Sequence, residues 1–325
     1  MTSYESRITS HGSPFDSAQG KANTDIRSAL RDAIAQLERE HVPSAALAAE
    51  LLLIHALGRD RAWLYGHPEE ELDAATREQY FSQIARRASG IPTQHLTGHQ
   101  EFWGLDFEVT PDVLIPRPET EHVIEVALER LGIGSDASSP RRKEEFRIAD
   151  VGTGSGCIAI ALAHELPAAR VIATDISAAA LEVACRNAER HSVASRIDFV
   201  ECNLADFLTH ESQIASHESR SLDLIASNPP YIGHREAAAL PREVREHEPE
   251  VALFGGEIGT EIYAPLIEQA AMLLKPGGIL VLELGYKSAD RVSRLLDAPG
   301  WEGVVLTNDL AGISRVASAF RTVSV

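Results

Sequence analysis

The sequence has little cysteine and no long unbroken apolar stretch. Its 325 residues include only Cys157, Cys185 and Cys202, and no two of these have Cys-x-x-Cys spacing. Such a composition excludes a disulfide framework and a cysteine zinc site, and it is typical of a reducing cytoplasm. No apolar run approaches the roughly 18 residues that a membrane-spanning helix needs. We therefore expect a cytoplasmic protein that does not cross a membrane.

Basic residues are also scarce. Lys and Arg total 30 against 48 Asp and Glu, which gives a formal net charge of −18. An acidic surface repels phosphate backbones, and nucleic-acid binders usually carry a basic stripe. DNA or RNA is therefore not expected as the main partner, although this argument leaves room for a local basic patch. The 13 histidines are scattered along the chain, and we expect no metal site.

The length suggests two domains, and the first half of the chain shows their boundary. Residues 1–23 are polar and are predicted to be a disordered extension. Residues 24–90 are predicted to form a helical domain, because apolar residues recur there at helical spacing. The first helix has a stripe of Ile26, Leu30, Ile34 and Leu37, and the second has Leu47, Leu51 and Ile54. This domain contains no acid–base constellation, so we expect it to dock a protein substrate.

The rest of the chain alternates strands with helices. Residues 91–114, rich in Pro and Gly, contain a short alternating run and are predicted to be a β-hairpin linker. Residues 115–325 are predicted to form a Rossmann-like α/β domain around a parallel, doubly wound sheet. Its strands are expected at 147–151, 171–174, 197–200, 222–226, 279–283, near 304–306 and at 315–321. The polar stretches 134–145 and 209–221 are expected to be exposed loops.

A glycine-rich loop follows the first strand of this domain. Its residues are Gly152, Thr153, Gly154, Ser155 and Gly156, preceded by Asp150. Glycines allow a tight turn and close approach of a ligand, and the following helix offers free N–H groups. A dinucleotide fingerprint would need its third glycine at position 157, which is a cysteine. The GxGxG spacing therefore predicts that these residues bind S-adenosylmethionine, the alternative being a ligand-free turn.

Two further strand ends carry candidate cofactor contacts. Asp175 ends the second strand, where a carboxylate can accept hydrogen bonds from both ribose hydroxyls. The alternative is a helix cap, although Ser177 is already a good cap. Asn203 and Leu204 follow the third strand and are predicted to lie beside the adenine, the alternative being an ordinary turn.

The fourth strand runs into a tetrapeptide that we predict to be catalytic: Asn228, Pro229, Pro230 and Tyr231. An amide or amino –NH₂ group has two donors, which the Asn228 side-chain oxygen and the Pro229 carbonyl can accept. Tyr231 can pack on the flat face of the same group, and Asn228 is also expected to face the cofactor. Displacement at a methyl carbon needs mainly orientation. The tetrapeptide thus predicts methyl transfer to a planar amide or amine nitrogen.

From about residue 24 onward the chain resembles the protein-(glutamine-N5) methyltransferases that act on peptide chain release factors, the HemK/PrmC family. The resemblance is carried by LIPRPETE at 114–121, the linker from Ile91 to Gly104, ALFGG at 252–256, DLAG at 309–312 and the tetrapeptide. The tetrapeptide alone is shared with adenine-N6 methyltransferases. Its combination with the PRPETE stretch is far more specific.

The resemblance implies a class I S-adenosylmethionine-dependent fold and methylation of the glutamine in a Gly-Gly-Gln motif, with S-adenosylhomocysteine as product. It also implies that Phe102 and Glu119 lie near the cofactor or substrate. Phe102 could instead be linker core, and Glu119 a first-turn helix acid. The chain departs from the family at His95, where a tyrosine is usual, and at Asn203, which often is acidic.

Three alternatives remain at this point. A glutamine methyltransferase of a ribosomal protein would use the same chemistry. A nucleic-acid adenine-N6 methyltransferase would share the glycine loop, Asp175 and the tetrapeptide, but the net charge of −18 opposes it. A non-catalytic binding module would retain the fold without needing every site residue, all of which are present here.

Overall fold

The computed structural model describes residues 24–133, 139–206 and 222–322. The predicted extension 1–23, the predicted loop 209–221 and residues 134–138 of the other predicted loop lie outside the described residues. The chain divides into two compact units, Met1–Ala88 and Ser89–Val325. Each unit is described by itself.

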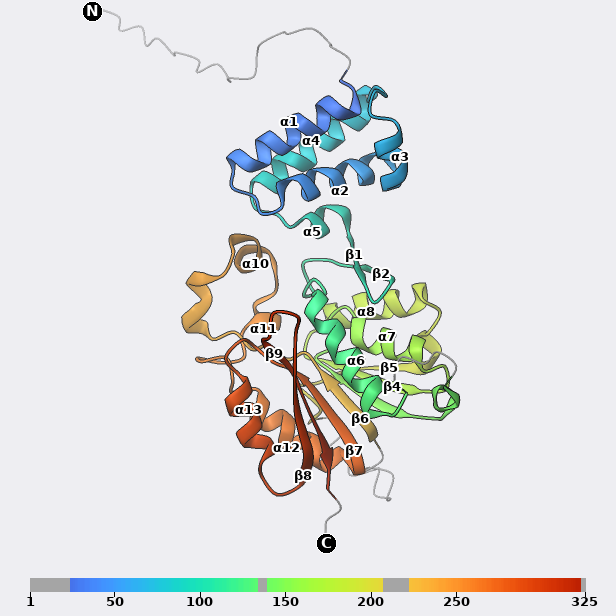
Figure 1. Ribbon diagram of the computed structural model, residues 1–325, viewed down its shortest axis with the longest axis vertical. Helices are drawn as coiled ribbons and strands as arrows, with labels where there is room; N and C mark the ends of the chain where they lie inside the picture. Colours follow the sequence, from blue (N-terminus) through green and yellow to red (C-terminus); the bar gives the residue numbers. More distant parts are fainter. Residues whose placement is uncertain (1–23, 134–138, 207–221, 323–325) are drawn as a thin grey trace, which may run out of the picture. The chain divides into compact units, whose positions relative to one another are not determined.

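The first unit is helical (Figure 1). It contains α1 (Ile26–Arg39), α2 (Ala45–Leu57), α3 (Arg61–Gly66) and α4 (Ala74–Ala88). The Asp25 carboxylate begins α1 by accepting from the backbone N–H of Ser28 at 2.7 Å, and Gly58 ends α2 in a left-handed conformation. Helices α1, α2 and α4 pack on one another around Leu37, Leu52 and Tyr80, which are fully buried.

The apolar stripe predicted for the second helix is wrong. Leu47 and Leu51 are 47% and 37% exposed, whereas Leu52 and Leu53 are fully buried. The sequence AALAAELLLIHAL is apolar on nearly every side of α2. The hydrophobic pattern of this helix therefore does not indicate which of its faces is buried.

The second unit begins with α5 (Thr93–Thr97) and a two-stranded antiparallel hairpin, β1 (His99–Phe102) and β2 (Leu105–Glu108). The Asn187 side chain joins this hairpin to the glycine loop. Its amide oxygen accepts from the Glu108 N–H at 2.7 Å, and its amide nitrogen donates to the carbonyls of Glu108 at 3.0 Å and Ser155 at 2.9 Å. The hairpin is thus part of the second unit's packed structure.

Seven strands form the sheet of this unit in the order β5-β4-β3-β6-β7-β9-β8. They are β3 (Arg147–Val151), β4 (Arg170–Asp175), β5 (Ile197–Glu201), β6 (Leu222–Ser227), β7 (Leu274–Glu283), β8 (Trp301–Asn308) and β9 (Ser314–Arg321). The first five are parallel, but β9 is antiparallel to both β7 and β8. The predicted parallel, doubly wound sheet is present, but the antiparallel direction of β9 was not predicted; it arises because the short turn at 309–313 joins β8 and β9 as a hairpin.

Helices cover both faces of the sheet (Figure 1). On one face lie η1 (Pro118–Thr120) with α6 (Glu121–Arg130), α7 (Cys157–Glu165) and α8 (Ala178–Arg190); on the other lie α12 (Tyr263–Leu273) and α13 (Ala289–Leu296). Short elements fill the connections: η2 (Pro140–Lys143), η3 (Ala194–Arg196), η5 (His234–Ala239), α10 (Arg242–His247) and α11 (Glu250–Leu253). None of the helices in the described ranges is long and apolar enough to cross a membrane.

The strand order places two predicted motifs side by side. Strand β3 has β4 on one side and β6 on the other. The chain first adds β4 and β5 on one side of β3 and then returns to add β6 on its other side, so the topological switch point of the sheet lies between β3 and β6. Asp150 pairs with Ala226, and each strand continues into its motif within two residues. Ligands of open α/β sheets bind at the carboxyl ends of strands at such a switch point. The glycine loop and the tetrapeptide meet there.

Candidate active site

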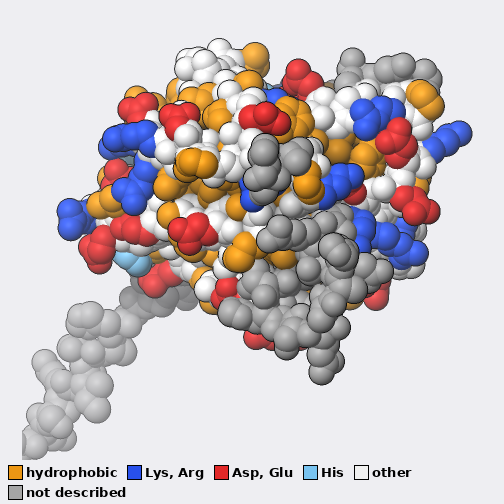
Figure 2. All heavy atoms as spheres, turned by 90° about the horizontal axis from the view of Figure 1, so that it is seen from below, with side chains coloured by type: hydrophobic (Ala, Val, Ile, Leu, Met, Phe, Trp, Pro, Cys, Tyr) orange, Lys and Arg blue, Asp and Glu red, His pale blue; other side chains and the backbone are white. Residues whose placement is uncertain are grey.

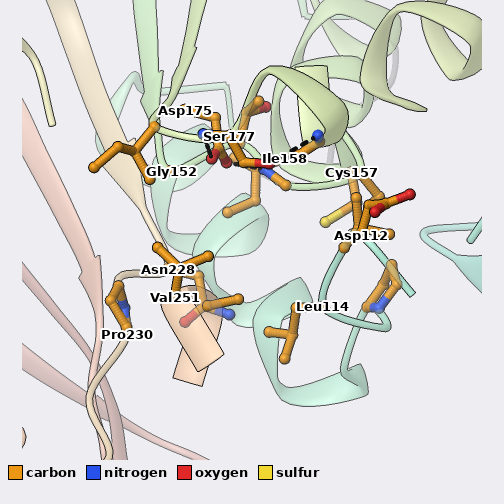
Figure 3. Close-up of a pocket in the computed structure, with 18 of the residues that line it drawn as sticks. Asp112, Leu114, Gly152, Cys157, Ile158, Asp175, Ser177, Asn228, Pro230 and Val251 are labelled. Carbon is orange, nitrogen blue, oxygen red and sulfur yellow. Dashed lines mark hydrogen bonds between the residues drawn. The ribbon is translucent and has the colours of Figure 1, made fainter. Parts of the chain in front are cut away.

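A cavity of about 220 Å³ lies at this edge of the sheet (Figure 3). Figure 3 shows Asp175 and Ser177 toward one end of it and Asn228, Pro230 and Val251 toward the other. The predicted site residues that line it are Gly152, Thr153, Gly154, Ser155, Asp175, Asn203, Leu204, Asn228 and Pro230. Residues from four strand ends are therefore gathered around one space.

The glycine loop turns sharply between β3 and α7. Gly152, Gly154 and Gly156 all have positive φ, at 75°, 55° and 83°. Gly156 begins α7 and does not line the cavity. Its φ of 83° is one that L side chains rarely adopt, and a Cβ at this position would also lie 3.3 Å from the Cα of Ala184, so the turn and its packing on α8 favour a glycine here.

Asp150 stabilises the glycine loop through hydrogen bonds to the loop and to the start of α7. Its carboxylate is fully buried and accepts from the Thr153 hydroxyl at 2.6 Å and from the Ala159 N–H at 3.0 Å. Burial raises the pKa of Asp150 to about 7. The acidic residue that precedes the glycines thus fixes the loop's shape and does not itself face the cavity.

Asp175 has hydrogen-bonding capacity left over for a ligand. One carboxylate oxygen accepts from the Gly154 N–H and the other from the Ser177 N–H, each at 2.9 Å. A carboxylate has about four acceptor positions, so each oxygen can accept once more. Burial raises the pKa of Asp175 above its usual value. The cap of α8 is Ser177, which accepts from the Ala180 N–H at 3.2 Å.

Much of the cavity's wall is apolar. Ile176, which follows Asp175, and Val251, toward the other end, line the cavity and are 52% and 50% exposed. Leu204 also lines the cavity; its φ is 52°, and its carbonyl accepts from the Thr174 hydroxyl at 2.6 Å. Exposed apolar groups around a concave site are suited to a flat, weakly polar ring.

Asn228 stands between two cavities. A second cavity of about 190 Å³ is lined by Asn228, Pro229 and Tyr231, and it shares Leu114, Arg117 and Ala252 with the first. The Asn228 side-chain nitrogen donates to the Thr120 hydroxyl oxygen at 3.0 Å. Within the described residues, no hydrogen bond engages the Asn228 side-chain oxygen or the Pro229 carbonyl. Two acceptors are thus available where the cavities meet.

The backbone after Asn228 is held by the segment 252–256. The Ile232 N–H donates to the Leu253 carbonyl, and the Gly255 N–H donates to the Ile232 carbonyl, both at 3.0 Å. At Gly255 a Cβ would lie 2.1 Å from the Pro230 carbonyl oxygen. Only glycine fits against the tetrapeptide here, which explains why the ALFGG stretch has a glycine at position 255.

Besides Gly156, two predicted site residues line neither cavity. Phe102 is 1% exposed and packs edge-on against Phe107, with ring centroids 6.1 Å apart, in the core of the second unit. Glu119 is exposed in η1. Burial raises the pKa of Glu283, and the charge of Glu119 raises it further. The structure therefore places Phe102 in the linker core and leaves Glu119 outside both cavities.

The sequence interpretation missed several residues at this site. Arg117 and Thr120 line the first cavity, and Glu283 contacts Tyr231. The first two belong to the LIPRPETE stretch, from which only Glu119 was predicted as a site residue. Glu283 ends the strand next to the tetrapeptide's strand, and a polar residue at that position was a usable signal. Among the described residues, no three His, Cys, Asp or Glu side chains gather as metal ligands would.

Two family models match the chain. The PrmC N-terminal domain matches residues 28–98, and the methyltransferase small domain matches residues 136–246. Release factor glutamine methyltransferases from Koribacter versatilis and Moorella thermoacetica are each 44% identical to it, over 90% and 91% of this chain and 96% and 98% of the relatives. The chain belongs to the release factor glutamine methyltransferase family. A further member, from Nitratidesulfovibrio vulgaris, is 41% identical over 92% of this chain and 96% of its own.

Solved structures support the fold of this family member. The hMettl16 catalytic domain, in complex with MAT2A 3'UTR hairpin 6, has a TM-score of 0.52 and 20% identity, covering 74% of this chain and 81% of that one. At this identity the likeness concerns the fold alone. Together with the family membership, it confirms the predicted Rossmann-like methyltransferase sheet preceded by a helical domain.

Proposed function

We propose that this enzyme methylates the side-chain amide nitrogen, N5, of the glutamine in the Gly-Gly-Gln motif of a peptide chain release factor. S-adenosylmethionine would be the methyl donor and S-adenosylhomocysteine the product. The observation that carries the proposal is the pair of open acceptors, the Asn228 side-chain oxygen and the Pro229 carbonyl, between two cavities. Family membership supplies the substrate class.

The first cavity fits the proposed methyl donor. Asp175 has acceptor positions left for two ribose hydroxyls, Ile176 offers an apolar surface to adenine, and the glycine loop leaves room for the amino-acid end. The bound donor supplies a methyl group on a positively charged sulfur. The chain's own residues do the rest: they hold two reactants in line and exclude water.

The tetrapeptide fits a primary amide entering from the second cavity. Asn228 and Pro229 would each accept one hydrogen of the substrate –NH₂ group, which fixes the plane of the amide. The nitrogen's out-of-plane face would then point toward the first cavity. The Tyr231 ring lines the second cavity and can pack against the flat amide. Orientation of this kind can supply much of the rate enhancement, because the thioether is a good leaving group.

A direct comparison of substrates tests the proposal. Purified enzyme with methyl-labelled S-adenosylmethionine should label a release factor at the Gly-Gly-Gln glutamine, as located by peptide mass spectrometry. A release factor with that glutamine replaced by alanine should remain unlabelled. Faster labelling of a ribosomal protein or of duplex DNA would contradict the proposal in favour of the corresponding alternative.

The charge distribution favours a protein substrate over nucleic acid. The formal net charge is −18, and Figure 2 shows Asp and Glu interspersed with Lys and Arg on the described part of the face in view. Binding to a nucleic-acid backbone relies on clustered positive charge. The RNA hairpin seen with hMettl16 is a partner of that protein.

We also propose that the helical unit docks the release factor through a groove along α1 and α3. The groove encloses about 520 Å³ and has an apolar lining that includes Leu30, Ile34 and Leu64, with Arg27, Arg31 and Glu38 among its polar members. A single glutamine side chain offers too little surface for selectivity, so remote contacts are needed. An apolar groove with charged margins resembles the core and rim of a protein interface.

A charge placed in this groove should weaken docking selectively. Leu30→Asp is expected to raise KM for the intact release factor about tenfold or more, since one buried apolar contact is lost and a charge is desolvated. Methylation of a short Gly-Gly-Gln peptide should change little. Leu47→Asp is the matched control, because Leu47 is an exposed leucine of the same unit outside the groove. Equal losses on peptide and protein, or equal effects of the two variants, would contradict the docking role.

A further inference from the structure

Glu283 is a buried carboxylate beside the tetrapeptide. It ends β7, next to β6, and is 2% exposed. One of its oxygens accepts from the Tyr231 hydroxyl at 3.1 Å. The other is buried without a hydrogen-bond partner among the described residues. Glu283 lines neither cavity, so any effect it has on the reaction must pass through its neighbours.

Thr120 connects Glu283 with Asn228. It is 1% exposed, and its hydroxyl oxygen accepts from the Asn228 side-chain nitrogen at 3.0 Å. Burial raises the pKa of Glu283, and the Thr120 side chain opposes that rise. A hydroxyl has a single proton to donate. If Thr120 donates this proton to Glu283, it can only accept a hydrogen bond from Asn228.

We propose that Thr120 and Glu283 are positioning residues that hold the Asn228 amide with its oxygen toward the substrate. An ionised carboxylate can only accept hydrogen bonds. Because the Thr120 oxygen accepts from the Asn228 nitrogen, its single proton is free to be donated to the partnerless Glu283 oxygen. The Asn228 oxygen is left as the group that faces the substrate –NH₂. Glu283 also fixes the Tyr231 hydroxyl, so one carboxylate orients the first and last residues of the tetrapeptide. This inference rests on the proposed function.

Through Thr120, the orientation of the Asn228 amide depends on whether Glu283 is ionised. When Glu283 is protonated it can donate to Thr120, and Thr120 can donate to the Asn228 oxygen. The Asn228 side-chain amide then rotates by half a turn, so that its –NH₂ group faces the –NH₂ group of the substrate. Two donors cannot hydrogen-bond to each other. Burial raises the pKa of Glu283 to about 7, so the turned form gains population as the pH falls below that value. The titratable or charged groups that act on Glu283 from the surrounding elements are Glu119, Arg315, Tyr231, Tyr263 and Cys157.

Variants at Thr120 separate the hydrogen bonds from the packing. In single-turnover assays on the release factor at saturating S-adenosylmethionine, Thr120→Val should lower the rate about tenfold, the loss typical of one misplaced hydrogen bond. Thr120→Ser keeps the hydroxyl and should restore most of the rate. Calorimetry should show that the two variants differ far less in S-adenosylhomocysteine affinity than in rate. Glu283→Gln should be slow at every pH and should lose the decline in rate below about pH 7 that the wild type shows.

A spectroscopic readout keeps the test independent of the substrate. In ¹⁵N-labelled enzyme with S-adenosylhomocysteine, the Asn228 side-chain amide signals are those missing from Asn228→Asp. They should shift with the same pH midpoint as the rate, and this shift should be absent in Glu283→Gln. Equal losses in Thr120→Val and Thr120→Ser, or an unchanged titration in Glu283→Gln, would overturn the inference. A wild-type enzyme that titrates as described but leaves the release factor unmethylated would instead count against the proposed function.

Discussion

Asn228→Ala should slow the methyl-transfer step by roughly 100-fold or more, while S-adenosylhomocysteine affinity stays close to that of the wild type. The side-chain oxygen of Asn228 is one of the two acceptors available where the cavities meet, and alanine leaves the substrate nitrogen with the Pro229 carbonyl alone. Rapid-quench single-turnover kinetics with saturating donor and release factor would measure the step directly.

Asn203→Ala provides a matched control, because Asn203 is an asparagine that lines the first cavity but not the second. Its loss should change donor affinity more than the chemical step. If Asn228→Ala weakened donor binding without slowing the saturated reaction, Asn228 would belong to the donor site only.

Asp175→Ala should cost roughly 2–4 kcal/mol of S-adenosylhomocysteine affinity, through the loss of two charge-assisted hydrogen bonds to ribose. Isothermal titration calorimetry would measure this. Part of the loss could arise because Asp175 also accepts from the Gly154 and Ser177 N–H groups. The experiment must therefore separate ribose recognition from the shape of the loop.

An analogue of S-adenosylhomocysteine that lacks the ribose 2′-hydroxyl makes that separation. The wild type should bind it more weakly than the full compound, whereas Asp175→Ala should bind the two about equally. Such a cycle isolates the pairwise contact from effects on the loop. If the variant discriminated between the two compounds as strongly as the wild type, Asp175 would not be the ribose acceptor.

The parts of the fold and site that the sequence predicted are those with local signals. Gly152, Asp175 and Asn228 each follow an apolar strand directly, and parallel strands bring their carboxyl ends to one edge. The three residues do line a single cavity. The family resemblance, confirmed by relatives at 40–44% identity, rested on continuous stretches of the same kind.

What the sequence did not predict depends on contacts between distant elements. Asn228 and Thr120 are 108 positions apart, and Tyr231 and Glu283 are 52 apart. Hydrophobic periodicity does not predict such pairs. Tyr231 meets Glu283 because β6 lies beside β7, and Asn228 meets Thr120 because η1 lies beside the end of β6. The exposed face of α2 was mispredicted for a related reason. A helix that is apolar all round has its buried side chosen by its neighbours.

The position of Asn228 between two adjoining cavities has a consequence for inhibitor design. In the proposed function the first cavity holds the adenosyl group of the donor, which other methyltransferases also bind, so compounds that fill it alone should discriminate poorly among methyltransferases. The second is lined by Leu240, Val244 and Leu253, which come from the segment after the tetrapeptide. A single molecule that carries an adenosyl group and a primary amide on a short linker could occupy both. Linking makes the second contact intramolecular, which raises affinity without a new interaction. Selectivity would then come from the amide-bearing half.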